Sequence, residues 1–261
     1  MEYEYILTRV ENRIATLTLN RPQVSNAFCN QLCMEAVEAL NSFSERRDVG
    51  AVVLTGAGKH FSAGGDIHRM KELIESGEYL TTDSAKWPSA FMTAIRQCKK
   101  PVIAMINGAA SGAGFACALA CDFRVVDPNS RMTMAFVNMG LGGDTGSIFN
   151  LVRLVGQEKA EMMMMLGEPC VGEECCRLGL AGTFAEEGKL AEMTYALAEK
   201  LAGKSNYAQQ WQKRLINSYF YDKLPAFCAD EGMEIADCSR QPDFTEAVNA
   251  FLEKRPPVYN Q

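Results

Sequence analysis

The segment His60-Phe61-Ser62-Ala63-Gly64-Gly65-Asp66-Ile67 follows a short apolar run at residues 51–55 and precedes a segment with helical periodicity. A second segment repeats this arrangement after the apolar run at residues 101–106; it reads Asn107-Gly108-Ala109-Ala110-Ser111-Gly112-Ala113-Gly114-Phe115. Short apolar runs bounded by turn residues are typical of buried strands, and strands that alternate with helices form largely parallel sheets. The two segments therefore predict an α/β fold in which a glycine-rich loop follows each of two buried strands.

The flanking sequence extends this pattern on both sides. Further strands are predicted at residues 14–20, 123–126 and 131–134, and helices at residues 30–46 and 112–119. After residue 144 the sequence predicts helices alone, at residues 147–166, 173–179, 187–203, 205–221, 225–239 and 243–254. A length of 261 residues suits a core with an appendage. We divide the chain into an α/β core, residues 1–195, and a helical region, residues 196–261.

The amino-acid composition argues against nucleic-acid binding, membrane contact and a metal site. The formal net charge is −6, and an acidic protein is poorly suited to general nucleic-acid binding, which needs Lys and Arg to neutralise phosphates. No leader-like apolar segment opens the sequence and no run of 18 apolar residues occurs, so we expect a cytoplasmic protein without membrane contact. Ten cysteines without a Cys-x-x-Cys pair, and only two histidines, favour reduced thiols over a metal site.

Both glycine-rich loops have the composition to hold a negatively charged oxygen. Small residues let a ligand approach the main chain, and the start of a helix offers free N–H donors at the positive end of its dipole. Two such loops that face one point form an oxyanion hole. The alternative is that both are only tight strand-to-helix turns. Neither loop has the P-loop pattern or the complete dinucleotide-binding pattern, which disfavours those two ways of binding a nucleotide phosphate.

Six motifs, in the same order along the chain, resemble those of the crotonase, or enoyl-CoA hydratase/isomerase, superfamily. They are Asn20-Arg21-Pro22 with Asn26-Ala27, Phe61 to Ile67, Lys100 to Ala104, Asn107 to Gly114, Cys121-Asp122-Phe123 and Phe251 to Pro256. The resemblance implies a crotonase (ClpP-like) spiral of ββα units with a helical C-terminal trimerisation region. It also implies a homotrimer, or a hexamer made of two trimers, that binds an acyl-CoA thioester and needs no cofactor beyond the coenzyme A of its substrate.

The same resemblance assigns the site residues. The N–H groups of Gly65 and Ala113 are the two oxyanion donors, and these residues form the catalytic set together with Asp144. The residues expected to bind the substrate or its coenzyme A are Ala63, Gly65, Asp66, Ile67, His68, Ala113, Phe136 and Lys254. A solvated surface position is the alternative for His68 and for Lys254. Asp66 is also expected to cap the helix that follows it.

Which reaction an enzyme of this superfamily catalyses depends on its acid/base residues. Hydratases of the superfamily carry two glutamates, at the positions that Ala116 and Phe136 occupy in this sequence. Neither of these side chains transfers a proton, so hydration by the two-glutamate route is disfavoured. Asp144 is the remaining acid, at a position that is functional in some isomerases and in a dehalogenase of the superfamily. Capping of the following helix is the alternative role for Asp144.

The site pattern is most similar to that of the ring-1,2-epoxyphenylacetyl-CoA isomerases, except in the loop from Gly143 to Ile148. We therefore predict an acyl-CoA isomerase that shifts a double bond, or opens an epoxide ring, through a thioester enolate, with Asp144 as acid and base. The alternatives are a hydrolase or dehalogenase with Asp144 as the nucleophile, and a hydratase with non-standard acid/base residues. A non-enzymatic RNA-binding relative is disfavoured by the acidic pI of about 5.2.

Overall fold

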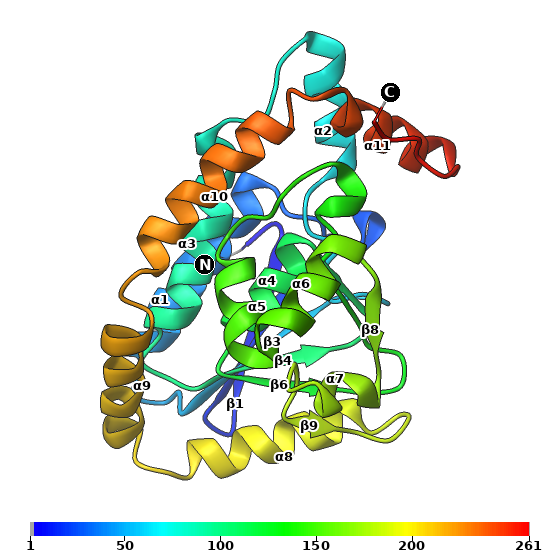
Figure 1. Ribbon diagram of the computed structural model, residues 1–261. Helices are drawn as coiled ribbons and strands as arrows, with labels where there is room; N and C mark the ends of the chain where they lie inside the picture. Colours follow the sequence, from blue (N-terminus) through cyan, green and yellow to red (C-terminus); the bar gives the residue numbers. More distant parts are fainter. Residues whose placement is uncertain (1–2, 261) are drawn as a thin grey trace.

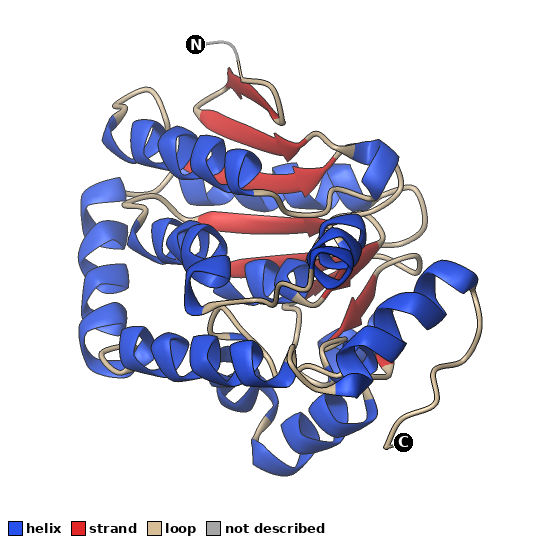
Figure 2. Cartoon of the chain, turned by 90° about the horizontal axis from the view of Figure 1, so that it is seen from above, coloured by secondary structure: helices blue, strands red, loops and turns tan. Residues whose placement is uncertain are grey.

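The computed structural model describes residues 3–260, which form two β-sheets. The larger sheet has six strands in the order β1 (Ile6–Glu11), β2 (Ile14–Leu19), β3 (Ala51–Gly56), β4 (Val102–Ile106), β6 (Phe123–Val126) and β9 (Thr183–Phe184). β1 is antiparallel to β2, and every later pair is parallel. Figure 2 shows this sheet with helices packed around it, which confirms the predicted α/β class.

The smaller sheet contains β5 (Ala109–Ser111), β7 (Arg131–Thr133) and β8 (Pro169–Val171). The chain passes from the larger sheet to the smaller one twice, from β4 to β5 and from β6 to β7. The first crossing needs glycine at Gly108, because its φ is +149° and a Cβ there would overlap the carbonyl oxygen of Lys59. α4 (Ala113–Ala120) follows β5 directly, which completes one ββα unit.

Helices cover both faces of the larger sheet. α1 (Asn30–Glu45) and α3 (Lys86–Gln97) pack together on one face, while α8 (Leu190–Ala202) crosses the other face (Figure 1). Side chains of β3 alternate between the two cores, so the whole strand is buried. Strands that are covered on both faces are continuous apolar runs. This explains why the apolar runs at residues 51–55 and 101–106 correctly predicted β3 and β4.

The last three helices return the chain to the glycine-rich loops. α9 (Asn206–Phe220) contacts α3, and α10 (Leu224–Cys238) packs against the short helix η2 (Thr82–Ala85). α11 (Pro242–Glu253) then contacts α2 (Ile67–Ser76) and η3 (Val137–Met139), and Figure 1 shows this path from α9 to α11. No helix within residues 3–260 is long and apolar enough to cross a membrane.

Two predictions for the chain after residue 144 are wrong: that residues 147–166 form one helix, and that this part of the chain contains helices alone. Residues 147–166 form two helices, α5 (Ser147–Val155) and α6 (Gln157–Leu166), because Gly156 has φ +79° and ψ 164°, outside the helical region. The short strands β8 and β9 also lie in this part of the chain, on either side of α7 (Glu173–Arg177). They have three and two residues, too few to show a periodic pattern.

The division of the chain between residues 195 and 196 falls inside α8. α8 packs against β2, β3, β4 and β6, so the complete helix lies on the α/β core. The helices that leave the larger sheet begin with α9 at Asn206.

Candidate active site

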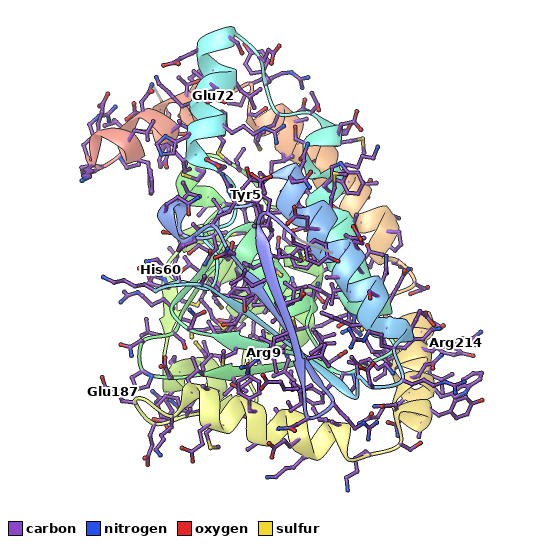
Figure 3. The ribbon with its side chains drawn as sticks, turned by 180° about the vertical axis from the view of Figure 1, so that it is seen from behind. Tyr5, Arg9, His60, Glu72, Glu187 and Arg214 are labelled. Atoms are coloured by element: carbon purple, nitrogen blue, oxygen red, sulfur yellow. The ribbon has the colours of Figure 1, made fainter. Side chains whose placement is uncertain are left out.

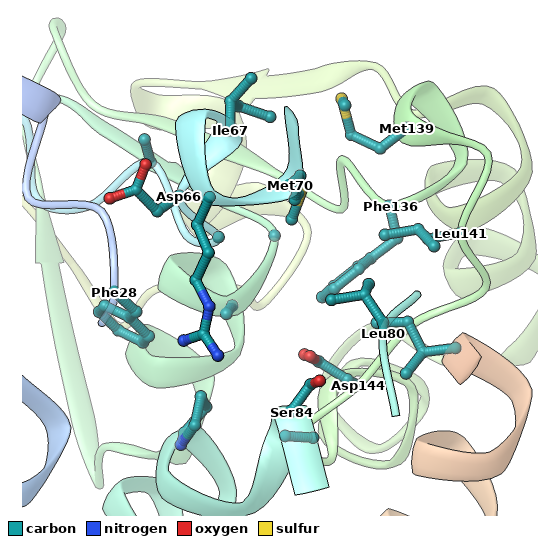
Figure 4. A pocket seen from close by; sticks show the side chains of 18 of the residues that line it. Phe28, Asp66, Ile67, Met70, Leu80, Ser84, Phe136, Met139, Leu141 and Asp144 are labelled. Atoms are coloured by element: carbon teal, nitrogen blue, oxygen red, sulfur yellow. The ribbon is translucent and has the colours of Figure 1, made fainter. Parts of the chain in front are cut away.

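A cleft opens where the two glycine-rich loops meet α10, at the carboxyl ends of β3 and β4. Its empty volume is about 940 Å³ including the open mouth, which suits a small-molecule site. Figure 4 shows its walls, which are mostly apolar. The apolar side chains that line it include Phe28, Ile67, Met70, Leu73, Leu80, Phe136, Met139, Leu141 and Ile235.

Main-chain hydrogen bonds hold the two loops together at the cleft. The N–H of Ser62 donates to the carbonyl of Ala109, and the N–H of Ser111 donates to the carbonyl of Ser62, both at 3.0 Å. The carbonyl of Gly64 accepts from the N–H of Phe28 at 2.7 Å. The loops are therefore fixed relative to each other before a ligand binds, which is what an oxyanion hole requires.

Gly64 is the point of closest approach between the loops. Its φ is +85°, and a Cβ there would lie 2.8 Å from the backbone nitrogen of Ala113 and closer still to the carbonyl oxygen of Ser111. Real Cβ atoms do not approach backbone atoms so closely, so only glycine fits without a shift of one loop.

Replacing Gly64 with alanine is expected to lower the free energy of unfolding by about 2–4 kcal/mol, because backbone strain and a main-chain clash add together. Gly77→Ala is the matched control: Gly77 has φ +73° but no atom within 4 Å of the added Cβ. This control should lose only about 1–2 kcal/mol, the cost of the backbone conformation alone. Urea denaturation measures both losses, and equal losses would contradict the close approach of the loops.

The two predicted oxyanion donors, the N–H groups of Gly65 and Ala113, belong to residues that line the cleft. Ala113 is the first residue of α4, so its N–H has no carbonyl partner inside the helix. The N-cap residue, Gly112, has no side chain that could accept this N–H. Within residues 3–260, neither N–H donates to a loop or turn carbonyl. Both donors are thus available to a ligand.

The carboxyl of Asp144 is present in the same cleft (Figure 4). The residue is only 9% exposed, and Phe136 and Leu141 line the cleft with it. Its carboxyl accepts a hydrogen bond from the Thr145 hydroxyl at 3.0 Å. Burial raises the pKa of Asp144 to about 6, while the Thr145 bond opposes the rise. A carboxyl with this pKa is able to take up and return a proton near neutral pH.

The Asp144 side chain does not cap α5, which was its alternative role. The N-cap residue of α5 is Gly146, and no side chain of the preceding loop caps the helix. The N–H groups of Gly146 and Ile148 donate instead to the carboxylate of Glu231 on α10, at 2.6 and 3.3 Å. Sequence reasoning missed Glu231, which is 85 residues away from Gly146, and no local sequence pattern indicates the contact.

Asp66 is the second carboxyl that lines the cleft. It accepts from the N–H of His68 at 3.2 Å and so caps α2, as predicted. The same carboxyl pairs with the guanidinium of Arg21 at 3.1 Å. Among the described residues that line the cleft, Asp144 is therefore the carboxyl that no ion pair engages.

The structure brings most of the predicted binding residues together. Those that line the cleft are Ala63, Gly65, Asp66, Ile67, Ala113 and Phe136. His68 and Lys254 are exposed and do not line the cleft, so their contact with coenzyme A stays a prediction. His60 and Glu72, which are visible from behind in Figure 3, do not line the cleft either.

The two positions of the hydratase glutamates carry no acid. Ala116 is fully buried inside α4 and does not line the cleft. Phe136 lines the cleft and contributes an aromatic ring. The acid/base chemistry of the cleft therefore has to come from another residue.

The family model for enoyl-CoA hydratase/isomerase matches residues 9–261. The chain belongs to this family. Its fold is similar to that of an enoyl-CoA hydratase from Mycobacterium avium subsp. paratuberculosis, with a TM-score of 0.89, 23% identity and 100% of both chains covered. This similarity confirms the predicted crotonase fold.

Some of the proteins that are similar in sequence to this chain are isomerases. The chain is 30% identical to the trans-2-decenoyl-[acyl-carrier-protein] isomerase of Streptococcus mutans over 263 residues, which cover 99% of each chain. It is also 30% identical to the 1,2-epoxyphenylacetyl-CoA isomerase of Escherichia coli over 257 residues, which cover 98% of each chain. These similarities establish an enzyme of the hydratase/isomerase family, and the reaction has to be argued from the residues of the cleft.

Proposed function

We propose that this protein is an acyl-CoA isomerase that moves a double bond by a 1,3-proton shift, with Asp144 as its acid/base residue. The observation that carries the proposal is the position of Asp144: a buried carboxyl, engaged by no ion pair within residues 3–260, in the cleft that also presents Gly65 and Ala113. Ala116 and Phe136, in place of the hydratase glutamates, favour isomerisation over hydration.

The proposed reaction begins with the thioester oxygen between the N–H groups of Gly65 and Ala113. The Asp144 carboxylate takes a proton from the carbon next to the thioester carbonyl of a 3-enoyl chain. The C–H electron pair moves toward the carbonyl and gives a dienolate, whose negative charge lies mainly on the thioester oxygen. The two donors stabilise this oxygen more than the neutral carbonyl oxygen of the substrate, which lowers the barrier.

The second half of the proposed reaction returns the same proton. The protonated Asp144 carboxyl gives it to the carbon two positions further along the chain, and the double bond ends next to the thioester. One carboxyl serves both steps because the dienolate is planar and exposes both carbons on one face. One proton leaves and one returns, so this scheme needs no redox cofactor and no metal. Opening of an epoxide ring would begin in the same way, with removal of the α proton by Asp144. The electron pair of the enolate would then break the adjacent C–O bond, and the protonated Asp144 carboxyl would give its proton to the leaving oxygen.

A second candidate function uses the same carboxyl as a nucleophile. Attack of the Asp144 carboxylate on the substrate would form an ester with the enzyme, as in hydrolysis or dehalogenation. Mass spectrometry of the protein during turnover distinguishes the two schemes, because only the nucleophilic scheme adds the mass of the acyl or aryl group to the peptide that contains Asp144.

The function is tested by incubating the purified protein in D₂O with 3-enoyl-, 2-enoyl- and epoxidised arylacetyl-CoA thioesters. We expect an isomer of the substrate. Whenever the protonated Asp144 carboxyl exchanges with D₂O before it returns the proton, deuterium should appear at the γ carbon of an enoyl chain, and reversal of the reaction should carry it to the α carbon. A 3-hydroxyacyl product without deuterium at the γ carbon would show a hydratase, and the proposal would fail.

The pH dependence of kcat/KM is expected to follow the ionisation of Asp144. The base must be a carboxylate, so activity should be low at acidic pH, rise as the pH passes through about 6 and then level off. Initial rates between pH 4.5 and 8 at constant ionic strength measure this profile. A flat profile over this range, or a fall through pH 6, would contradict a carboxylate base with a raised pKa.

We also propose that α9 contributes to a homotrimer or hexamer. Its residues Tyr207, Trp211, Leu215 and Tyr219 recur at intervals of four and are between 43 and 76% exposed. An exposed apolar stripe of this kind is typical of an interface between subunits. Light scattering coupled to gel filtration tests this, and a monomer at micromolar concentration would contradict it.

A further inference from the structure

Glu231 is a buried carboxylate to which the proposed proton shift gives no role. It lies on α10, is 5% exposed, and does not line the cleft. Its two oxygens accept separate main-chain hydrogen bonds, from Gly146 at 2.6 Å and from Ile148 at 3.3 Å. These N–H groups open α5, so a side chain from a distant helix supplies the cap that the local sequence lacks.

The segment that Glu231 binds has an unusual backbone. Gly143, Thr145 and Gly146 all have positive φ, at +153°, +55° and +77°. Thr145 is β-branched, and a β-branched residue in this conformation costs about 1–3 kcal/mol. Such a conformation persists only when the surroundings hold it. Asp144 lies between Gly143 and Thr145, so it belongs to the segment whose end Glu231 binds.

α10 also packs tightly against the segment that Glu231 binds. A Cβ added to Gly146 would lie 2.7 Å from Cδ1 of Leu224 at the start of α10. Ile235, one turn beyond Glu231, reaches the wall of the cleft. α10 therefore contacts the segment at its start and the substrate site near its end, and Glu231 lies between these contacts.

No positive side chain offsets the two carboxyls: within residues 3–260, neither Asp144 nor Glu231 forms an ion pair. Burial raises the pKa of Glu231 to about 7, and the nearby Asp144 adds to the rise, while the bonds from Gly146 and Ile148 oppose it. The other titratable groups that face the pair are the thiols of Cys228 on α10 and Cys33 on α1, and burial raises the pKa of both. The charge of Asp144 is therefore one of the causes that raise the pKa of Glu231.

We propose that Glu231 is a positioning residue for Asp144: by binding the first turn of α5, it sets where the Asp144 carboxyl lies in the cleft. The proposal rests on the proposed role of Asp144 in the proton shift. Glu231 does not line the cleft, and it acts on Asp144 through the segment whose N–H groups it binds. A helix from the C-terminal region thus completes a site whose other parts come from the glycine-rich loops.

The first test compares Glu231→Gln with Glu234→Gln. Glutamine keeps the volume of the side chain but replaces one oxygen with an amide group that cannot accept an N–H. We expect Glu231→Gln to lower kcat about 10- to 100-fold, since small displacements of a catalytic group have effects of this size. KM should change less than about threefold. Glu234 is exposed on the same helix, and Glu234→Gln should keep the wild-type kcat.

The second test needs no substrate. Carboxyl ¹³C NMR of aspartate-labelled protein follows Asp144 against pH, with Asp144→Asn to assign the signal. Glu231→Gln should move the Asp144 signal and shift its titration curve, because the segment that carries Asp144 loses one of its two bonds to Glu231, from Gly146 or from Ile148. An unchanged titration curve together with wild-type kcat in Glu231→Gln overturns the proposal.

Two other results have to be distinguished: a Glu231→Gln variant that does not fold, and a wild-type protein that has no isomerase activity. If Glu231→Gln does not fold, Glu231→Asp takes its place, because the shorter side chain cannot reach both N–H groups. Wild-type kcat and an unchanged Asp144 titration in that variant also overturn the proposal. If the wild-type protein isomerises no thioester but the NMR signals behave as expected, the proposed function fails while the link between Glu231 and Asp144 stands.

Discussion

Replacing Asp144 with asparagine is expected to lower kcat for the 1,3-proton shift about 10³-fold and to leave KM almost unchanged. General acid/base catalysis contributes about 10²–10⁴-fold to rate, and Asp144 performs both proton transfers in the proposed scheme. Asparagine has the same shape but does not ionise. The thioester oxygen still meets the N–H groups of Gly65 and Ala113, so substrate binding is retained. Steady-state kinetics on the best thioester measure this effect, and wild-type kcat in the variant would exclude Asp144 as the base.

The stability of the same variant provides its control. The difference between the ordinary aspartate pKa of 3.8 and about 6 corresponds to about 3 kcal/mol that opposes the ionised carboxyl in the folded protein. Because the pKa is raised, the stability that the protonated form contributes is complete below pH 3.8 and is lost as the pH rises through 6. At pH 7 Asp144→Asn should therefore be at least as stable as the wild type in urea, so lost activity cannot be ascribed to unfolding.

The sequence correctly predicted those strands whose pattern of apolar residues lies within the strand itself. β3 and β4 are buried on both faces, so each is an uninterrupted apolar run. β5 is different: Ala109–Ser111 consists of small residues with little preference for a strand. It becomes a strand because it pairs with β7, and a pairing between distant residues leaves no mark on the local sequence.

The same distinction applies to the site. Gly65 and Ala113 were predicted because each belongs to a contiguous motif that forms its own loop. Asp144 was identified only after Ala116 and Phe136 were excluded as acids. Its raised pKa depends on burial among residues from several elements. Glu231 lay beyond prediction because its contact with α5 exists only once α10 has packed against the core.

Replacing Ala113 with proline is expected to lower kcat about 10²–10³-fold, the loss that follows removal of one oxyanion donor. Proline has no N–H, and Ala113 is the first residue of α4, the helix position that accepts proline best. The substitution therefore removes the donor at the position where the helix is least affected. The preceding residue, Gly112, has no Cβ to clash with the proline ring, which further limits the change to the backbone.

Ala113→Gly is the matched control for this prediction. Glycine keeps the N–H and removes only a methyl group, so its kcat should remain within about threefold of the wild type, with a loss of about 1 kcal/mol of stability at most. Circular dichroism and urea unfolding establish that α4 is intact in both variants. If the proline and glycine variants have equal kcat, the thioester oxygen does not depend on the N–H of Ala113. A selective loss in the proline variant, with KM little changed, places the interaction in the transition state, because removal of a contact that substrate and enolate share equally would raise KM instead.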